Sequence, residues 1–224
     1  VPSLLLELQP NHQVLDIAAA PGSKTSQIAA LLNNTGTILA NDISHARLYK
    51  LKANLETLGV TNTTVHHGLG ERIYQQFPAV FDAALADVPC SMMGRINIHD
   101  PKSNRPWSHK ENKSLAKRQQ WLLLSAISSV HSGGVVVYST CTLNVLENEA
   151  VVDWVIKKSN RRVTIEEIVI PEFPMQLNSG EQVVIPGATT WRDQHYHPDM
   201  SKTWRIVPNS LMEGFFVAKL RVID

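Results

Sequence analysis

The sequence predicts an α/β fold in which helices cover both faces of a mostly parallel sheet. Strand-like and helix-like segments alternate over the first two thirds of the 224 residues, and this is the order of a parallel sheet joined by crossover helices. Val135–Thr140 is a continuous run rich in β-branched residues, typical of a strand buried on both faces. Five prolines after Arg161 exclude long helices there, so we expect short antiparallel strands at one sheet edge.

Local patterns predict the individual elements. Ser44 is placed to cap the second helix, Gly59 to end it, and Gly133-Gly134 to end the long third helix. We expect one domain, with a core at 1–160 and edge strands and loops at 161–224. In chain order the expected elements are strand Gln13–Ile17, helix Thr25–Leu32, strand Thr37–Asp42, helix Ser44–Leu58, strands Thr63–His67 and Phe81–Asp87, helix Lys110–Val130, strand Val135–Thr140, helix Asn144–Lys158, and strands Val163–Ile170, Arg205–Val207 and Phe215–Val222.

Composition excludes several classes of protein. With 43% hydrophobic and 18% charged residues, the chain is typical of a globular protein. Its apolar runs are far shorter than the roughly 20 residues of a membrane span, and the start lacks the pattern of a signal peptide. Two cysteines cannot build a disulfide scaffold. We therefore expect a cytoplasmic protein without membrane contact, and the net charge of +1 gives no overall sign of a nucleic-acid partner.

Two turns carry the residues expected to bind a ligand, because ligands of open α/β sheets bind beyond the carboxyl ends of the strands. The small residues of Ala18–Lys24 allow a ligand to approach the backbone, and the helix that follows offers free N–H groups. A plain strand–helix turn is the alternative. Asp42 ends the next strand, where a carboxylate suits a ribose, although a helix-capping Asp would look the same.

Two further turns carry the only cysteines of the chain. Cys90 follows Asp87-Val-Pro, and Cys141 follows Tyr138-Ser-Thr, so both lie at the carboxyl ends of predicted strands. A single cysteine is most often an inert buried side chain. That interpretation is weaker here because both cysteines lie on the rim where ligands bind.

These motifs resemble the Nol1/Nop2/Sun (RsmB/NOP) family of S-adenosylmethionine-dependent RNA 5-methylcytosine methyltransferases. The resemblance implies a class I methyltransferase (Rossmann-like) fold, with a seven-stranded sheet closed by an antiparallel C-terminal hairpin. It spans nearly the whole chain and rests on Ala19–Thr25, Asp42, Asp87-Val-Pro-Cys90-Ser, Tyr138–Thr142 with Glu147-Asn-Glu149, and Arg205–Pro208 with Gly214–Lys219.

The resemblance also implies the reaction and the role of each residue. C5 of cytosine is a weak nucleophile, and a thiolate that adds to C6 activates it. Cys141 is the implied nucleophile, Cys90 assists release of the product, and Asp87 bonds the N3/N4 edge of the cytosine. The implied cofactor is S-adenosylmethionine and the substrate RNA, with ribosomal RNA slightly preferred over transfer RNA. The residues expected to bind the cofactor are Ala18, Ala19, Ala20, Pro21, Gly22, Ser23, Lys24, Asp42 and Asp87.

The chain departs from the family pattern in two places. The family has an Asp after the third strand, whereas His67-Gly68-Leu69 offers no acid there, and Glu71 is a substitute in a different register. After Pro-Cys-Ser, Met92-Met93-Gly94 replaces Gly-x-Gly, and this bulk is expected to narrow the cytosine pocket.

A basic segment beside Cys90 is the candidate RNA contact. Arg95–Arg118 holds seven basic and two acidic residues, with Trp107 inside it and Trp121 just beyond, a combination that suits phosphates and unstacked bases. A solvated helix face is the alternative. The candidates are Arg95, Lys102, Arg105, Lys110 and Lys113. His195, His197 and Asp199 are more typical of a solvated loop than of a metal site, so we expect no metal, and we expect a monomer.

Two other functions fit part of the pattern. A DNA cytosine methyltransferase would take its nucleophile from the proline-cysteine motif, which would leave Cys141 without a role. A catalytically silent RNA-binding or assembly factor would keep the fold but would need neither cysteine.

Overall fold

The computed structural model describes residues 1–96, 100, 103, 108–171, 173, 175–176, 180, 182–209 and 212–224. Its strands and helices, with η for a 3₁₀ turn, are η1 Pro2–Leu5, β1 Gln13–Asp16, α1 Ser23–Leu31, β2 Thr37–Asp42, α2 His45–Thr57, β3 Thr63–His67, η2 Gly70–Gln75, β4 Phe81–Asp87, η3 Met93–Arg95, α3 His109–Ser129, β5 Val130–Thr140, η5 Val145–Glu147, α4 Glu149–Lys158, β6 Val163–Glu166, β7 Val184–Pro186, β8 Thr190–Trp191, β9 Gln194–His195, η6 Pro198–Lys202, β10 Trp204–Ile206 and β11 Phe215–Val222.

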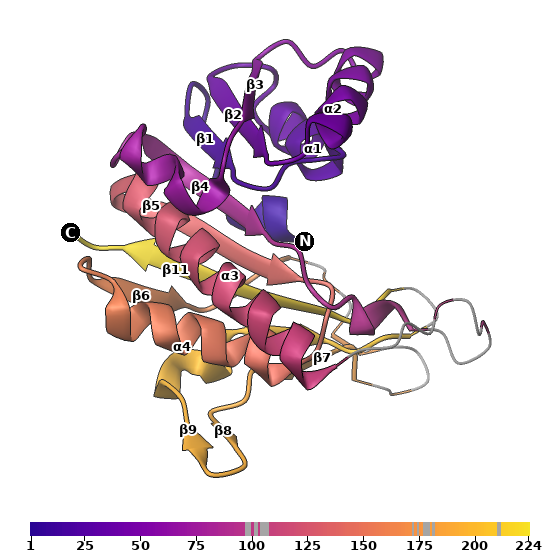
Figure 1. Cartoon of the computed structure of the whole chain (residues 1–224), viewed down its shortest axis with the longest axis vertical. Coiled ribbons are helices and arrows are strands. Elements are labelled where there is room, and N and C mark those ends of the chain that lie inside the picture. The colour runs from indigo at the N-terminus through magenta and orange to yellow at the C-terminus, as the bar shows by residue number, and fades with distance from the viewer. Residues whose placement is uncertain are drawn as a thin grey trace.

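The sheet confirms the expected α/β fold class. Its strands follow the order β3-β2-β1-β4-β5-β11-β10-β7, and β6 also pairs with β11. Strands β1 to β5 run parallel, so the carboxyl ends of β1, β2, β4 and β5 meet at one edge. Figure 1 shows the arrows of β4 and β5 pointing the same way, with α3 and α4 across one face of the sheet.

Apolar side chains pack against both faces of the sheet. One buried cluster joins α3, α4 and η2 to β4, β5 and β11. A second joins η1 and α1 to the opposite face, and a third packs α2 against β2. No helix in the described ranges is long and apolar enough to cross a membrane.

The C-terminal strands join the sheet antiparallel, as expected. Strand β11 pairs with β5 in a register that sets Phe216 opposite Thr140, and β10 and β7 follow beyond it. The described sheet has nine strands, two more than the seven expected. The three-residue strand β7, which ends in Pro186, carries no pattern that marks it in the sequence.

Three predicted element boundaries differ from the structure by more than two residues. The helix expected from Asn144 is split, because Asn148 takes a non-helical conformation (φ −117°, ψ −96°) between η5 and α4. Strand β5 begins at Val130, and Gly133, at φ +85°, lies within it instead of separating it from α3. Strand β6 ends at Glu166, four residues earlier than predicted. By contrast, Ser44 caps α2 and Gly59 follows its end at φ +67°, both as expected.

Candidate active site

The two cysteines meet at the carboxyl edge of the sheet. Strands β4 and β5 are neighbours in a register that sets Asp87 opposite Ser139, so the turns that follow them lie side by side. The sulfur atoms of Cys90 and Cys141 are 3.2 Å apart, and both side chains are partly buried. The edge predicted from the sequence thus brings both candidate thiols to one point.

The two thiols shift each other's pKa in opposite directions. The hydrogen bond from Cys90 lowers the pKa of Cys141, and the positive charge of Arg95 lowers it further, against the effect of burial. The same hydrogen bond, together with burial, raises the pKa of Cys90. Thiolates are the nucleophilic form of cysteine, so the opposite pKa shifts favour Cys141 as the nucleophile and Cys90 as the protonated partner.

Asp87 joins the two halves of the site. Its carboxylate forms an ion pair with Lys24, with Nζ 2.6 Å from Oδ2, and accepts a hydrogen bond of 2.7 Å from the Ser139 hydroxyl. Lys24 belongs to the Ala18–Lys24 turn and Ser139 to β5, so this carboxylate connects the expected cofactor turn to the cysteine turns.

The expected cofactor turn is held by Asp42. Its buried carboxylate accepts hydrogen bonds from the backbone N–H groups of Ala20 (3.3 Å) and Ser44 (2.9 Å). Arg47 lies 3.1 Å from the same carboxylate and donates to the Ala20 carbonyl. Asp42 therefore supports the turn and the start of α2, which is the structural role left open by the sequence. Gly22 adopts φ +108°, and a Cβ there would lie 2.7 Å from a methyl carbon of Leu51.

A small hollow lies between the ends of β1 and β2. It has a volume of about 50 Å³, and its lining includes Ala18, Asp42, Arg47, Gly70 and Arg118. The expected substitute Glu71 does not line it, and its carboxylate is paired with Arg118 at 2.7 Å.

Asp16, at the end of β1, is a further candidate that the sequence patterns did not single out. Its carboxyl group is buried and accepts a hydrogen bond of 2.7 Å from Thr25, and burial raises its pKa to about 7. A cation bound beside it would favour its ionised form. A signal exists in the sequence, because only Ile17 separates Asp16 from the turn expected to bind the cofactor.

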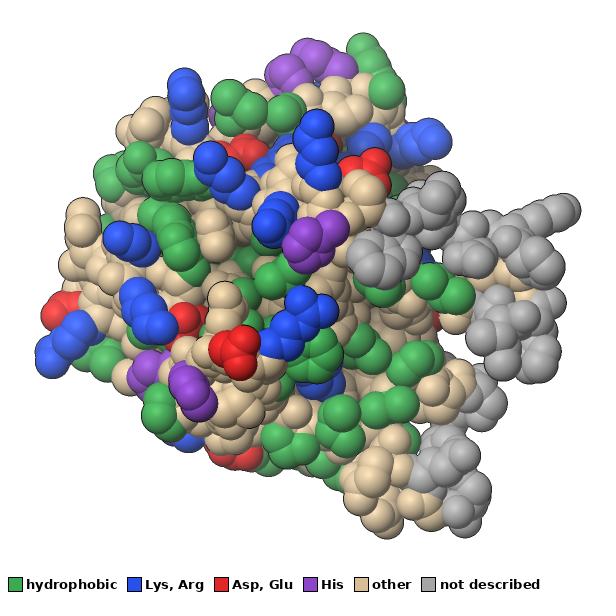
Figure 2. Space-filling view, turned by 60° about the horizontal axis from the view of Figure 1, so that its bottom comes forward, with side chains coloured by type: hydrophobic (Ala, Val, Ile, Leu, Met, Phe, Trp, Pro, Cys, Tyr) green, Lys and Arg blue, Asp and Glu red, His purple; other side chains and the backbone are tan. Residues whose placement is uncertain are grey.

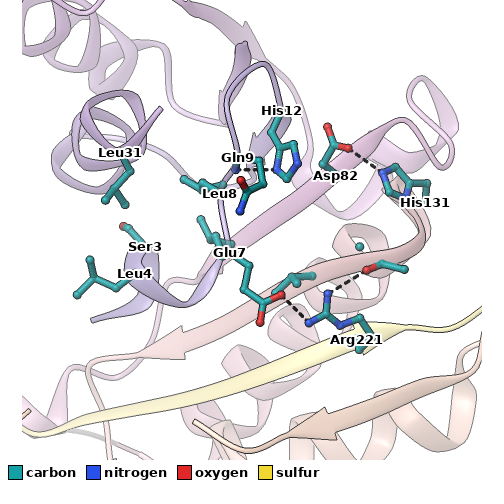
Figure 3. A pocket seen from close by; sticks show the side chains of 14 residues that line it. Ser3, Leu4, Glu7, Leu8, Gln9, His12, Leu31, Asp82, His131 and Arg221 are labelled. Atoms are coloured by element: carbon teal, nitrogen blue, oxygen red, sulfur yellow. Dashed lines mark hydrogen bonds and ion pairs between the residues drawn. The ribbon is translucent and has the colours of Figure 1, made fainter. Parts of the chain in front are cut away.

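A larger cavity lies away from the cysteines. Figure 3 shows this pocket, of about 660 Å³, between the N-terminal segment and the amino ends of β4 and β5. Its charged lining residues are paired with one another: His131 lies 2.9 Å from Asp82, and Glu7 lies 2.7 Å from Arg221. It contains none of the residues predicted to be functional.

The candidate RNA contacts are only partly described. Lys110 and Lys113 are exposed on α3, and Arg95 is exposed but paired with Glu213 at 2.8 Å. Trp121 is 45% exposed and packs edge-on against Trp154. On the face shown in Figure 2, Lys and Arg side chains are scattered among hydrophobic and uncharged ones. Lys102, Arg105 and Trp107 lie outside the described residues.

The residues at the two departures from the family pattern, and the group of His195, His197 and Asp199, make local structural contacts. His67 bonds the carbonyl of Ile43 at 2.9 Å, and Met92, at φ +57°, precedes η3. His197 Nδ1 accepts from the N–H of Asp199, whose carboxylate pairs with Lys202. Among the described residues no group of three or more His, Cys, Asp or Glu is placed to hold a metal ion.

The sequence is similar to that of several known proteins. The sequence model described as 16S rRNA methyltransferase RsmB/F matches residues 3–221. The human 28S rRNA (cytosine(4447)-C(5))-methyltransferase is 41% identical over 99% of this chain and 26% of its own length. The tRNA (cytosine(49)-C(5))-methyltransferase of Pyrococcus abyssi is 37% identical over 99% of this chain and 67% of its own. This chain thus spans about a quarter of the human relative and two thirds of the archaeal one.

One solved structure resembles this chain in both sequence and fold. The crystal structure of NSun6 from Pyrococcus horikoshii with SFG superimposes with a TM-score of 0.77 and 33% identity. The match covers the whole of this chain and 51% of that one.

Proposed function

Because the chain belongs to the 16S rRNA methyltransferase RsmB/F family, we propose that it transfers a methyl group from S-adenosylmethionine to C5 of a cytosine in RNA. The observation that carries this proposal is the pair of thiols 3.2 Å apart on the ligand-binding rim, with Asp87 at the end of the adjoining strand. A two-thiol site suits a reaction in which one sulfur forms a covalent bond to the base and the other assists its release.

The chemistry assigns a role to each side chain. The Cys141 thiolate adds to C6, and the new S–C6 bond places an electron pair at C5. Asp87 bonds the N3/N4 edge of the ring, held in place by Ser139. After C5 is methylated, Cys90, having released its own proton to solvent, accepts the C5 proton. The C5–H electron pair then forms the C5=C6 double bond, and the pair of the breaking S–C6 bond returns to Cys141.

The residues of the turns fit the proposed cofactor. When bound, S-adenosylmethionine supplies an electrophilic methyl group from a sulfonium centre. A cation of this kind suits a rim that carries the carboxyl groups of Asp16, Asp42 and Asp87. Asp42 would hold the ribose hydroxyls and the Ala18–Lys24 turn would offer its backbone, while Asp87 lies near the methionine end. SFG, an analogue of S-adenosylmethionine, accompanies the related NSun6 structure.

We further propose that the substrate is ribosomal or transfer RNA, with ribosomal RNA preferred. The relatives support both classes, since the human one is named for 28S rRNA and the archaeal one for tRNA. The chain would act as one catalytic domain, and Arg95, Lys102, Arg105, Lys110 and Lys113 would contact the RNA backbone.

The alternatives account less well for the site. A DNA-type enzyme would use Cys90 as the nucleophile, yet the shared hydrogen bond raises the pKa of Cys90 and lowers that of Cys141. A silent RNA-binding factor has no use for a lowered thiol pKa.

Methyl transfer from labelled cofactor tests the proposal directly. Total RNA from cells that lack the protein and genomic DNA are offered in parallel, and bisulfite sequencing then maps the modified cytosine. We expect label in RNA at a cytosine that is unmethylated without the protein. Label in DNA alone, or in neither nucleic acid, would refute the proposal.

A further inference from the structure

Three consecutive polar residues are fully buried just beyond the Cys141 turn. Glu147, Asn148 and Glu149 each have a relative exposure of 0%. Buried carboxylates are costly unless they are paired or hydrogen-bonded, so their partners indicate what the buried groups hold in place.

Glu147, together with Gln119, brackets Cys90. The carboxylate of Glu147 accepts a hydrogen bond of 2.9 Å from the N–H of Ser91, the residue after Cys90. The amide of Gln119 donates to the same carboxylate oxygen at 3.0 Å and to the carbonyl of Pro89, the residue before Cys90, at 2.8 Å. Both neighbours of Cys90 are therefore fixed by one Glu147–Gln119 unit.

Asn148 brackets Cys141 in the same manner. Its side-chain oxygen accepts a hydrogen bond of 2.6 Å from the hydroxyl of Thr140, the residue before Cys141. Its side-chain nitrogen donates at 2.9 Å to the carbonyl of Thr142, the residue after Cys141. Because Asn148 is adjacent to Glu147 in the chain, one turn of backbone sets the position of both thiols.

Glu149 holds a different part of the molecule. Its carboxylate pairs with the guanidinium of Arg205 at 2.5 and 2.8 Å, and accepts from the N–H of Ala188. None of these partners flanks a cysteine, and the nearest link is the hydrogen bond of 3.1 Å from Arg205 to the carbonyl of Leu143, two residues beyond Cys141. Glu149 therefore offers a matched control: an equally buried carboxylate, two residues from Glu147, that ties down the C-terminal strands.

We propose that Glu147 and Asn148 are positioning residues that divide the two cysteines between them, with Glu147 serving Cys90 and Asn148 serving Cys141. This proposal rests on the methyl transfer proposed above. Without the Glu147 hydrogen bonds the Cys90 turn is free to move, so addition to C6 proceeds while transfer of the C5 proton stalls. Without the Asn148 hydrogen bonds the Cys141 turn is free to move, so the S–C6 bond does not form.

The test compares four variants with the wild type: Glu147→Gln, Gln119→Leu, Asn148→Ala and, as control, Glu149→Gln. Two quantities are measured with unmodified ribosomal and transfer RNA transcripts: the rate of methyl transfer, and the amount of covalent protein–RNA complex on a denaturing gel. A displacement of about 1 Å costs on the order of 100-fold in rate, so we expect roughly 10- to 100-fold slower turnover in the first three variants.

The fate of the covalent complex separates positioning from a general loss of structure. The complex should accumulate in Glu147→Gln and Gln119→Leu, and be absent in Asn148→Ala. In Glu149→Gln the ratio of complex to product should equal that of the wild type, even if the melting temperature falls. Gln119→Leu keeps the test valid if Glu147→Gln does not fold, because it removes the hydrogen bond to Pro89 from a different helix. Absence of the complex in both Glu147→Gln and Gln119→Leu, or its accumulation in Asn148→Ala, would overturn the proposal.

A second measurement does not depend on RNA. The alkylation rate of Cys141 by iodoacetamide, followed by mass spectrometry across pH, reports its pKa. Displacement of either turn breaks the hydrogen bond between the two thiols, the bond that lowers the pKa of Cys141. The pH midpoint of Cys141 alkylation should therefore rise in the Glu147, Gln119 and Asn148 variants and stay unchanged in Glu149→Gln. If the wild type methylates no RNA, the proposed function fails, whereas an unchanged midpoint in all four variants refutes the positioning itself.

Discussion

The sulfur of Cys90 lies 3.2 Å from the sulfur of Cys141, across the ends of two neighbouring parallel strands. This pairing has a consequence for the order of the chemical steps. The hydrogen bond to Cys141, and its charge, raise the pKa of Cys90. Once Cys141 has bonded to C6, its sulfur has no negative charge and no longer shares the hydrogen bond with Cys90. The pKa of Cys90 therefore falls. Cys90 can then release its own proton to solvent, and only the resulting thiolate can accept the C5 proton, so this step follows formation of the covalent bond.

The first prediction concerns this mutual effect on pKa. In Cys90→Ala the pKa of Cys141 should rise, because the hydrogen bond from Cys90 is the largest cause that lowers it. In Cys141→Ala the pKa of Cys90 should fall. Alkylation follows the thiolate, so its midpoint should move to higher pH in the first variant and to lower pH in the second, relative to the wild type. Equal midpoints would show that the thiols do not share a proton.

The two cysteines should also give opposite results with RNA. Cys141→Ala should abolish both methyl transfer and covalent attachment, since no thiolate is left to add to C6. Cys90→Ala should accumulate a covalent protein–RNA complex, because addition proceeds while elimination stalls. Denaturing gels with labelled RNA check both outcomes. Loss of the complex in Cys90→Ala and its retention in Cys141→Ala would reverse the roles and favour the DNA-type mechanism.

Replacement of Asp42 should weaken cofactor binding. Asp42→Ala is expected to cost about 1.5–3 kcal/mol of binding free energy, the scale of a hydrogen bond to a charged group. Calorimetry with S-adenosylmethionine measures this value. Asp82→Ala is the matched control, because Asp82 is also paired with a basic side chain but lines the pocket at the opposite edge. Equal affinities in the two variants would leave Asp42 with only its structural role at Ala20 and Ser44.

Gly94 allows a close backbone approach behind the site. Its N–H donates to the carbonyl of Cys141 at 3.0 Å, and its carbonyl accepts from Gly214 at 2.8 Å. A Cβ at position 94 would collide with the Gly214 carbonyl and lie 2.9 Å from that of Cys141. Backbone atoms cannot move aside without a large energetic cost. Gly94→Ala should therefore displace the Cys141 turn and slow methyl transfer by roughly 10- to 100-fold. Gly59→Ala, where a Cβ meets no atom within 4 Å, should leave the rate unchanged even if strain at φ +67° lowers the melting temperature.

Sequence patterns predict the sheet and helices of the molecule better than the contacts between its side chains. The alternation of strands and helices and the run Val135–Thr140 predict the sheet because burial on both faces imposes a recognisable composition. The family resemblance is confirmed by the match over residues 3–221. Both cysteines lie at strand ends that a parallel sheet must bring to one edge, which is why their proximity follows from their positions.

Contacts between distant side chains follow no such pattern. Ser91 and Glu147 are 56 residues apart, and Lys24 lies at the start of α1 whereas Asp87 ends β4. Only the folded chain pairs them. Glu147-Asn-Glu149 stands out by resemblance, but its place in a predicted helix suggests neither its burial nor the break at Asn148. The three-residue strand β7 is stabilised by its neighbour β10 and not by its own composition.

The last prediction concerns the basic residues of the Arg95–Arg118 segment. An enzyme that acts on a base must turn it out of its stack, which costs least in unpaired RNA, and phosphate contacts would then hold the strand. Replacing Lys102, Arg105, Lys110 and Lys113 by Ala should weaken binding to all RNA sequences alike. For each lysine or arginine that bonds a phosphate, its removal should lower the dependence of affinity on salt by nearly one unit of logarithmic slope. Cofactor affinity should not change, because none of these residues is among those expected to bind the cofactor.

A smaller pair of variants separates a specific contact from a general effect of charge. Lys110→Ala with Lys113→Ala removes two exposed charges from α3, and Lys50→Ala with Lys52→Ala removes two exposed charges from α2. Both pairs change the net charge equally, so a general effect of charge would alter both salt slopes by the same amount. We expect a lower slope only for the α3 pair, measured as RNA affinity at several salt concentrations. Equal slopes in the wild type and the α3 pair would show that Lys110 and Lys113 belong to a solvated helix face, and that the RNA is held by other residues.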